Sequence, residues 1–138
     1  MLALLLNTTA YKLFGLLHVL AVIAAFGPLL IYPSMQRAGA GQAVAKLHLR
    51  LALPAMTLVW VLGMGLVGLS DDVLELTDPW ILVSLIGWVV LMVVSWFLIR
   101  PALTDTSATA RSRMASGIGI THLLLVVILY LMIFKPGL

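Results

Sequence analysis

Two histidines within long apolar stretches are the residues of this chain best suited to chemistry. His18 and His122 are the only side chains in these stretches that titrate near neutral pH. An ionisable residue inside a membrane is by default a candidate functional residue, and imidazole nitrogen binds haem iron and other metals. One interpretation is that both rings point into a helical bundle and bind a b-type haem. The other, which we favour, is that each ring hydrogen-bonds a neighbouring helix, for example at Thr57 or Ser84.

The depths of these two histidines disfavour a shared iron. His18 is six residues from Lys12, about 9 Å below the outer surface, at about 1.5 Å per residue. His122 is thirteen residues from Lys135, which corresponds to about 20 Å. A haem site that uses His18 alone therefore agrees better with the sequence than a bis-histidine site. We expect the third histidine, His48, to have only an interfacial role.

Four long stretches without a charged residue must position these histidines. Each approaches the roughly 20 apolar residues that cross a bilayer as a helix. The composition agrees, since 63% of the residues are hydrophobic, 9% are charged and the mean hydropathy is +1.19. The sequence predicts one all-α transmembrane domain over residues 1–138, a four-transmembrane-helix bundle. Its predicted spans are about 13–33, 51–70, 79–99 and 114–134.

The charged residues between these stretches sort by sign. Six bases occupy the first and third connections: Arg37, Lys46, Arg50, Arg100, Arg111 and Arg113. Four acids occupy the second: Asp71, Asp72, Glu75 and Asp78. By the positive-inside rule, the basic connections face the cytoplasm and both termini lie outside, in the inner membrane of a bacterium. Topology explains the net charge of +3, so we expect the lipid bilayer as a partner and no nucleic acid.

Several residues predict where the helices begin, end and meet the membrane surface. We expect the first helix to end near Pro33, and residues 42–50 to form an amphipathic helix along the interface. Asp78 is placed to cap the third helix. Tyr32 and Trp80 fall near predicted interfaces, where aromatic rings favour the headgroup layer.

Small residues indicate where helices approach closely. The predicted helix-packing residues are Gly63, Gly65 and Gly68 in the second span and Ala115 and Gly119 in the fourth. The fourth span could instead use Gly117 and Thr121, which lie on another face. This pattern favours a packed bundle that forms a homo-oligomer or joins other membrane subunits.

The first half of the chain resembles a known group of proteins. The segments that carry the resemblance are Leu16-Leu17-His18-Val19-Leu20, Ala25-Phe26-Gly27, Tyr32-Pro33, Arg37-Ala38 and Arg50-Leu51-Ala52-Leu53-Pro54, which leads into Gly63 to Gly68. They are similar to uncharacterised small four-helix bacterial membrane proteins, a group that resembles the copper-resistance D-type and J-type protoporphyrinogen oxidase membrane proteins. The resemblance implies haem binding at His18, by its position in the first helix. The chain departs from the J-type pattern because the third span lacks the partner lysine.

The residue types also favour some classes of function over others. We find no Ser/His/Asp or Cys/His constellation and no glycine-rich phosphate loop, so we expect no catalytic activity. The absence of cysteine excludes disulfides and thiolate metal sites. The sequence predicts a non-catalytic bundle or accessory subunit of a membrane complex. Haem or metal binding at His18 is one alternative, and a small transporter or channel is another.

Overall fold

The computed structural model describes residues 8–105 and 107–137, and in this part of the chain it contains helices and no strand. The first long helix is α2 (Thr9–Arg37), and the second joins α3 (Gly41–Leu47), the π-helical turn η1 (His48–Ala52) and α4 (Leu53–Gly68). The third joins α5 (Pro79–Val94), the π-helical turn η2 (Ser95–Ile99) and α6 (Arg100–Ala102), and the fourth is α7 (Ala108–Phe134). All four are long and apolar enough to cross a membrane. The predicted all-α bundle of a multi-pass membrane protein is therefore confirmed.

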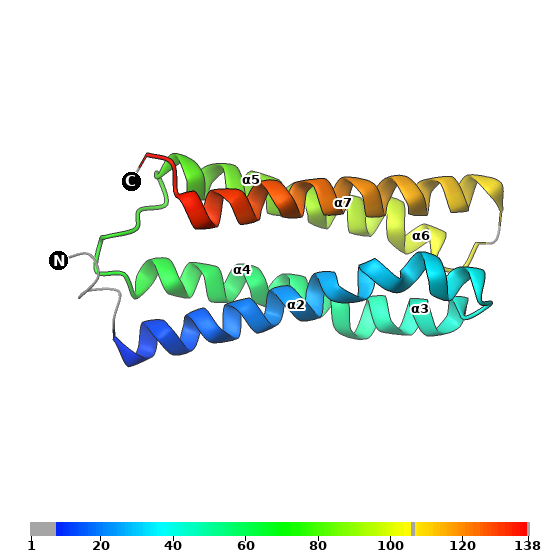
Figure 1. Cartoon of the computed structure of the whole chain (residues 1–138), viewed down its shortest axis with the longest axis horizontal. Coiled ribbons are helices and arrows are strands. Elements are labelled where there is room, and N and C mark those ends of the chain that lie inside the picture. The colour runs from blue at the N-terminus through cyan, green and yellow to red at the C-terminus, as the bar shows by residue number, and fades with distance from the viewer. Residues whose placement is uncertain (1–7, 106, 138) are drawn as a thin grey trace.

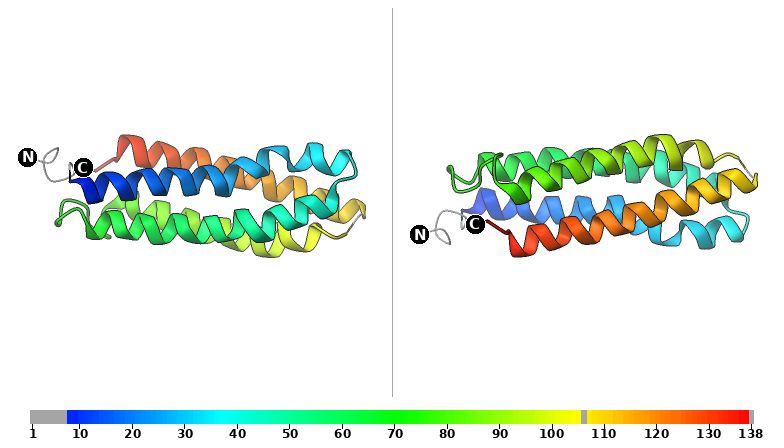
Figure 2. Two further views of the ribbon diagram at one scale, coloured as in Figure 1. Left: turned by 90° about the horizontal axis from the view of Figure 1, so that it is seen from below. Right: turned by 90° about the horizontal axis from the view of Figure 1, so that it is seen from above.

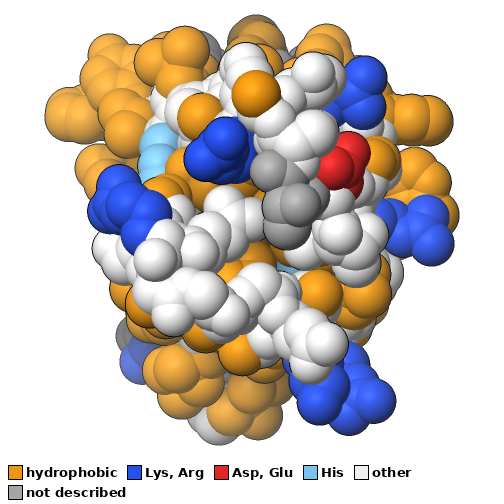
Figure 3. Space-filling view, turned by 90° about the vertical axis from the view of Figure 1, so that its right-hand side faces the viewer, with side chains coloured by type: hydrophobic (Ala, Val, Ile, Leu, Met, Phe, Trp, Pro, Cys, Tyr) orange, Lys and Arg blue, Asp and Glu red, His pale blue; other side chains and the backbone are white. Residues whose placement is uncertain are grey.

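The four long helices run side by side and alternate in direction (Figures 1 and 2). The start of α2, the end of α7 and the acidic connection, residues 69–78, lie at one end of the bundle, which we call the terminal end (Figure 1). The other end, which we call the basic end, carries the connection 38–40, the end of α6 and the start of α7. Figure 3 looks onto the basic end, where Lys and Arg side chains are spread around the surface.

Consecutive helices form two hairpins. In the first hairpin α2 packs along α4, and in the second α5 packs along α7. The turns η1 and η2 extend these contacts, because η1 packs on α2 and η2 packs on α7. Direct contact between α2 and α7 is sparse by comparison. The seam between these two helices is therefore a loosely closed part of the bundle.

Two prolines explain the π-helical turns. In each turn the first carbonyl, that of His48 or Ser95, accepts a hydrogen bond from the N–H five residues later. Pro54 lies six residues after His48, and Pro101 lies six residues after Ser95. Proline lacks an N–H and its ring clashes with the carbonyl four residues earlier. A locally widened helix removes this clash, so we attribute both turns to the prolines.

The predicted helix boundaries near the basic end are wrong. The first helix does not end near Pro33 but continues to Arg37. Proline removes only one hydrogen bond, and the buried side chains of Leu29 and Tyr32 hold this part of the helix in the core. Residues 42–50 do not form a separate interfacial helix, because they belong to the continuous second helix.

The start of α5 agrees with the prediction in position but not in chemistry. Asp78 occupies the N-cap position and Pro79 the first helical position, yet the carboxylate makes no capping hydrogen bond. Asp78 Oδ2 instead accepts a hydrogen bond from the N–H of Glu75 at 3.0 Å. The side chain thus closes the acidic connection rather than capping the helix.

The core lies toward the basic end. The buried residues of α2 fall between Ala21 and Tyr32, and those of α7 between Ala110 and Thr121. A second, small cluster at the terminal end is formed by Leu74, Trp80 and Ile81. Trp80 is only 4% exposed, so its expected role as an interface anchor is wrong. The acidic connection covers its ring by contributing Leu74 to the same cluster.

Candidate functional site

A fully buried histidine network joins three helices near the basic end. His48 lies at the start of η1 and is inaccessible to solvent. Its Nδ1 is hydrogen-bonded to the hydroxyl of Tyr32 on α2 at 3.2 Å. Its Nε2 is hydrogen-bonded to Oγ of Ser95, the first residue of η2, at 2.8 Å. The second of these bonds connects one helical hairpin to the other.

The spacing of buried residues on the second helix explains why His48 faces inward. Val44, His48 and Ala52 are all fully buried and follow one another at intervals of four, so they share a helical face. This stripe was the signal that could have located His48. The flanking charges Lys46 and Arg50 instead suggested an interfacial role, which is wrong. These two bases lie on other faces of the same helix and are exposed.

Tyr32 also differs from expectation. Its position just before Pro33 suggested an interface anchor, but its side chain is fully buried and its ring packs edge-on against His48, with centroids 5.7 Å apart. The prediction failed because α2 extends past Pro33. Tyr32 consequently lies inside the bundle rather than at its surface.

The chemistry of the network is structural. A neutral imidazole has one donor and one acceptor nitrogen, and hydroxyl groups can complement either tautomer. Both nitrogens of His48 are therefore satisfied by Tyr32 and Ser95, and neither is left to bind a metal. None of the three residues lines the pocket at the basic end that is described below. We conclude that the network holds the two hairpins together.

His18 packs directly against α4. A Cβ placed on Gly63 would lie 3.2 Å from Cε1 of the His18 ring, and one on Gly65 would lie 2.5 Å from Cε1 of Phe14. Both glycines are thus at the α2–α4 contact, whereas nothing lies within 4 Å of the Cβ position of Gly68. The Nδ1 atom of His18 is buried and has no hydrogen-bond partner in the described part of the chain.

His122 is also left with an unpaired nitrogen. Its Nε2 is buried without a partner among the described residues. The two hydroxyls expected to satisfy the histidines are used locally. Thr57 donates to the carbonyl of Leu53 at 3.3 Å, and Ser84 donates to that of Trp80 at 2.6 Å.

The helices α2 and α4 are in close contact at His18. The His18 ring lies against α4 at Gly63, so a haem between these two helices would require them to separate. Neither His18 nor His122 lines the pocket at the basic end or the smaller pocket beside Pro54 and Trp96. Across residues 8–105 and 107–137, no group of three His, Cys, Asp or Glu side chains could hold a metal ion. Haem binding thus receives no geometric support.

The small residues of α7 divide between an inner and an outer face. On the inner face, a Cβ on Gly117 would lie 2.7 Å from Cγ1 of Ile99, and the Thr121 hydroxyl donates to the Gly117 carbonyl at 2.7 Å. On the outer face, Ala115 and Gly119 are exposed, and nothing lies within 4 Å of the Cβ position of Gly119. The contact inside the bundle thus uses Gly117 and Thr121, the alternative pair predicted from the sequence. Within one copy of the chain Gly119 thus meets no neighbour, whereas Ala115 lines the pocket at the basic end.

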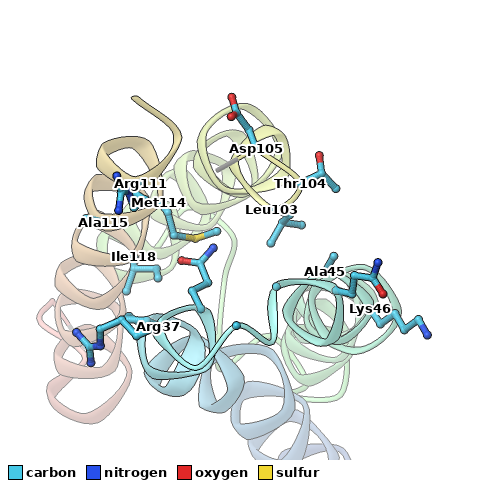
Figure 4. A pocket seen from close by; sticks show the side chains of 15 residues that line it. Arg37, Ala45, Lys46, Leu103, Thr104, Asp105, Arg111, Met114, Ala115 and Ile118 are labelled. Atoms are coloured by element: carbon cyan, nitrogen blue, oxygen red, sulfur yellow. The ribbon is translucent and has the colours of Figure 1, made fainter. Parts of the chain in front are cut away.

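The larger pocket opens at the basic end. Its volume is about 1120 Å³, and it lies between the end of α2, the start of α3, the end of α6 and the start of α7 (Figure 4). Three bases line it, together with three polar side chains and several apolar ones. The bases are Arg37, Lys46 and Arg111; the polar side chains are Gln36, Gln42 and Thr104; the main apolar ones are Pro33, Leu103, Met114 and Ile118.

One acid offsets part of the positive charge of these three bases. Asp105 lines the pocket and is exposed. Hydrogen bonds from the backbone N–H and the hydroxyl of Ser107 lower the pKa of its carboxyl group, with a smaller contribution from the charge of Arg113. Asp105 is therefore ionised at neutral pH. The pocket keeps a net charge of +2, from three bases and one acid.

Comparison of the chain with protein-family models, characterised proteins and solved structures returned no match.

Proposed function

We propose that this small multi-pass membrane protein is a non-catalytic assembly component that self-associates through the outer face of α7. The observation that carries the proposal is the open position at Gly119. Small residues drive helix association in membranes because they allow backbones to approach closely. In one copy of the chain, nothing lies within 4 Å of the Cβ position of Gly119, and the small residues one turn before it are exposed. The outer small face of α7 consists of Ser112, Ala115, Ser116 and Gly119.

The outer faces of other helices differ in a way that favours α7 as the contact. On α2 the Cβ positions of Gly15 and Gly27 are also open, but bulky exposed side chains such as Leu16, Val19 and Ile23 surround them and are suited to lipid. A second copy is the simplest partner for α7, because two-fold symmetry brings identical small faces together. Subunits of another membrane complex are the alternative partners.

Single cysteines test this interface without background, because the chain contains no cysteine. We expect Gly119→Cys to form a disulfide-linked dimer in native membranes under mild oxidation. Ile23→Cys, at a position that is 61% exposed on α2, is the matched control and should crosslink far less. We also expect Gly119→Leu to reduce the mass of the particle in mild detergent to that of a monomer. Equal crosslinking at both positions, or a monomeric mass for the unmodified chain, would refute self-association. A crosslink to a different protein would assign the face to another subunit.

We further propose that the basic end lies in the cytoplasm and that the membrane is a bacterial inner membrane. The separation of bases from acids at opposite ends of the bundle supports this orientation. A membrane-impermeant maleimide applied to intact spheroplasts should label Leu76→Cys in the acidic connection. It should label Thr109→Cys, at the start of α7, only after the membrane is opened. The reverse pattern would invert the topology.

Haem binding and transport do not form part of this proposal. The packing of His18 on Gly63 opposes the first, and the paired nitrogens of His48 favour a structural role over a proton-coupled one. The absorbance spectrum of the protein purified from haem-replete cells checks this directly. We expect no Soret band. A Soret band that His18→Ala removes would establish haem binding at His18, which the resemblance of the first helix implies.

A further inference from the structure

The pocket at the basic end lies at the depth of the lipid headgroups. The 29 residues of α2 measure about 43 Å along the helix axis, whereas the hydrocarbon core of a bilayer is about 30 Å thick. The ends of the helices therefore reach roughly 6 Å past the hydrocarbon on each side. Arg37, at the last turn of α2, and Arg111, in the first turn of α7, both lie in this zone.

These two arginines lie on one side of the pocket. In Figure 4 Arg37 and Arg111 lie on the same side of the pocket, at the end of α2 and the start of α7, and Met114 and Ile118 lie beside them. The Arg37 side chain extends outward from α2, where its Nη2 donates to Oγ of exposed Ser34 at 3.4 Å. Lys46 extends away on the other side, and Asp105 points away from the pocket (Figure 4). The positive charge is thus concentrated where α2 and α7 meet. Guanidinium groups bind phosphate through two parallel hydrogen bonds, so a pair of them is suited to a phosphate group.

The walls below the arginines are apolar. Pro33, Leu103, Met114 and Ile118 line the pocket toward the bundle interior, and the seam between α2 and α7 carries few contacts. A soluble anion would gain nothing from these walls. A lipid would gain binding free energy from both the arginines and the apolar walls, because its phosphate can contact the arginines while an acyl chain lies along the seam.

We propose that this pocket binds an anionic phospholipid from the leaflet at the basic end. The phosphate lies between Arg37 and Arg111, and an acyl chain lies against Met114 and Ile118. Basic pockets between transmembrane helices are known to bind anionic headgroups in this way. The pocket and the outer small face of α7 share Ala115, but the proposed phosphate and acyl contacts use other residues, and Gly119 does not line the pocket.

A simpler explanation of the arginines is that they only set the topology of the chain. Two other bases provide a control for it. Arg50 and Arg113 lie at the same end and are exposed, but neither lines the pocket. Replacing either pair by glutamine removes the same charge from the same end. Only the pocket pair should change the binding of a lipid.

Native mass spectrometry of the purified protein, with phosphatidylglycerol or phosphatidylcholine added to the micelles, tests the proposal. We expect preferential retention of phosphatidylglycerol, weakened about 25-fold by Arg37→Gln with Arg111→Gln, since each base near a membrane surface contributes about fivefold. Arg50→Gln with Arg113→Gln should retain wild-type binding. Arg111→Lys should keep part of the preference, which separates loss of binding from loss of folding. Equal weakening by both double variants, or equal retention of both lipids, would overturn the proposal. Displacement of the lipid by millimolar inorganic phosphate would reassign the pocket to a soluble anion, and Gly119→Leu should leave lipid retention unchanged.

Discussion

The two halves of the bundle are packed differently. We call the half that adjoins the basic end the basic half, and the other the terminal half. The basic half comprises residues 21–37, 41–56, 87–102 and 108–121, and the terminal half comprises 9–20, 57–68, 79–86 and 122–134. In α2, α4 and α7 every buried residue lies in the basic half. Only α5 and the acidic connection contribute buried side chains to the terminal half.

Buried polar groups follow the same division. In the basic half, His48, Ser95 and Thr121 are buried and hydrogen-bonded. In the terminal half lie all three buried side-chain nitrogens that have no partner among the described residues, those of His18, Trp80 and His122. Buried hydroxyls outside the basic half, those of Ser70 and Ser84, are paired with backbone groups near them in the sequence. Among the described residues, the side-chain hydrogen bonds between helices thus lie in the basic half.

This contrast shows what holds a bundle together in lipid. Lipid tails are as apolar as leucine, so helices gain little by burying apolar surface against one another. Close packing and hydrogen bonds between helices take over this role. The basic half has both, through the His48 network and the contact of Gly117 with Ile99. We infer that the basic half supplies most of the stability of the fold.

The largest expected effect is the loss of the His48 network. His48→Leu leaves the buried hydroxyls of Tyr32 and Ser95 without their partner, so we expect the free energy of unfolding to fall by about 2 kcal/mol. The same change in the terminal half, His18→Leu, removes no hydrogen bond of Nδ1, but the ring also meets α4 at Val59 and Gly63, so we expect a smaller loss of about 1 kcal/mol. Unfolding in mixed micelles, followed by circular dichroism, measures both variants. Similar losses for the two would remove the distinction between the halves.

A smaller effect is expected from adding one methyl group at a helix contact. Gly117→Ala places a Cβ 2.7 Å from fully buried Ile99, which cannot move freely, so we expect a loss of about 1 to 2 kcal/mol. Gly65→Ala meets the ring of Phe14 even more closely, at 2.5 Å, but that ring is only half-buried and can rotate away. Gly65→Ala should therefore lose less stability than Gly117→Ala. Gly119→Ala is the control and should keep or increase stability through helix propensity. A greater loss at Gly65 than at Gly117 would contradict this order.

The smallest expected effect is a difference in backbone protection within single helices. Amides in sparsely packed segments open more often than amides in a core. We expect the amides of residues 9–20 of α2 to exchange hydrogen about fivefold faster than those of residues 21–32. This ratio corresponds to a difference of about 1 kcal/mol in the free energy of local opening. Residues 122–134 of α7 should likewise exchange faster than residues 108–121. Mass spectrometry of the protein in nanodiscs measures these rates. Uniform protection along each helix would mean that lipid equalises the two halves.

Much of the fold follows from local patterns. Uncharged stretches of 20 or more residues predict helices that cross a bilayer, and they located all four long helices. The helix ends were harder to predict, because Pro33 usually marks a boundary and here lies within α2. The candidate site was harder still. His18 and His122 were chosen for their apolar surroundings, whereas the histidine that unites the helices lies between two bases.

The sequence by itself determined the number of crossings, the helical class and the separation of charge between the two ends. These depend on hydropathy and charge, which each segment carries independently of the others. Only the tertiary structure decided which histidine is paired, which glycines meet a neighbour and where the basic pocket lies. The rotation of one helix against another decides these contacts, and the widened turns before Pro54 and Pro101 alter that rotation. Residues 47 positions apart, such as His48 and Ser95, can therefore meet without any signal in the local sequence.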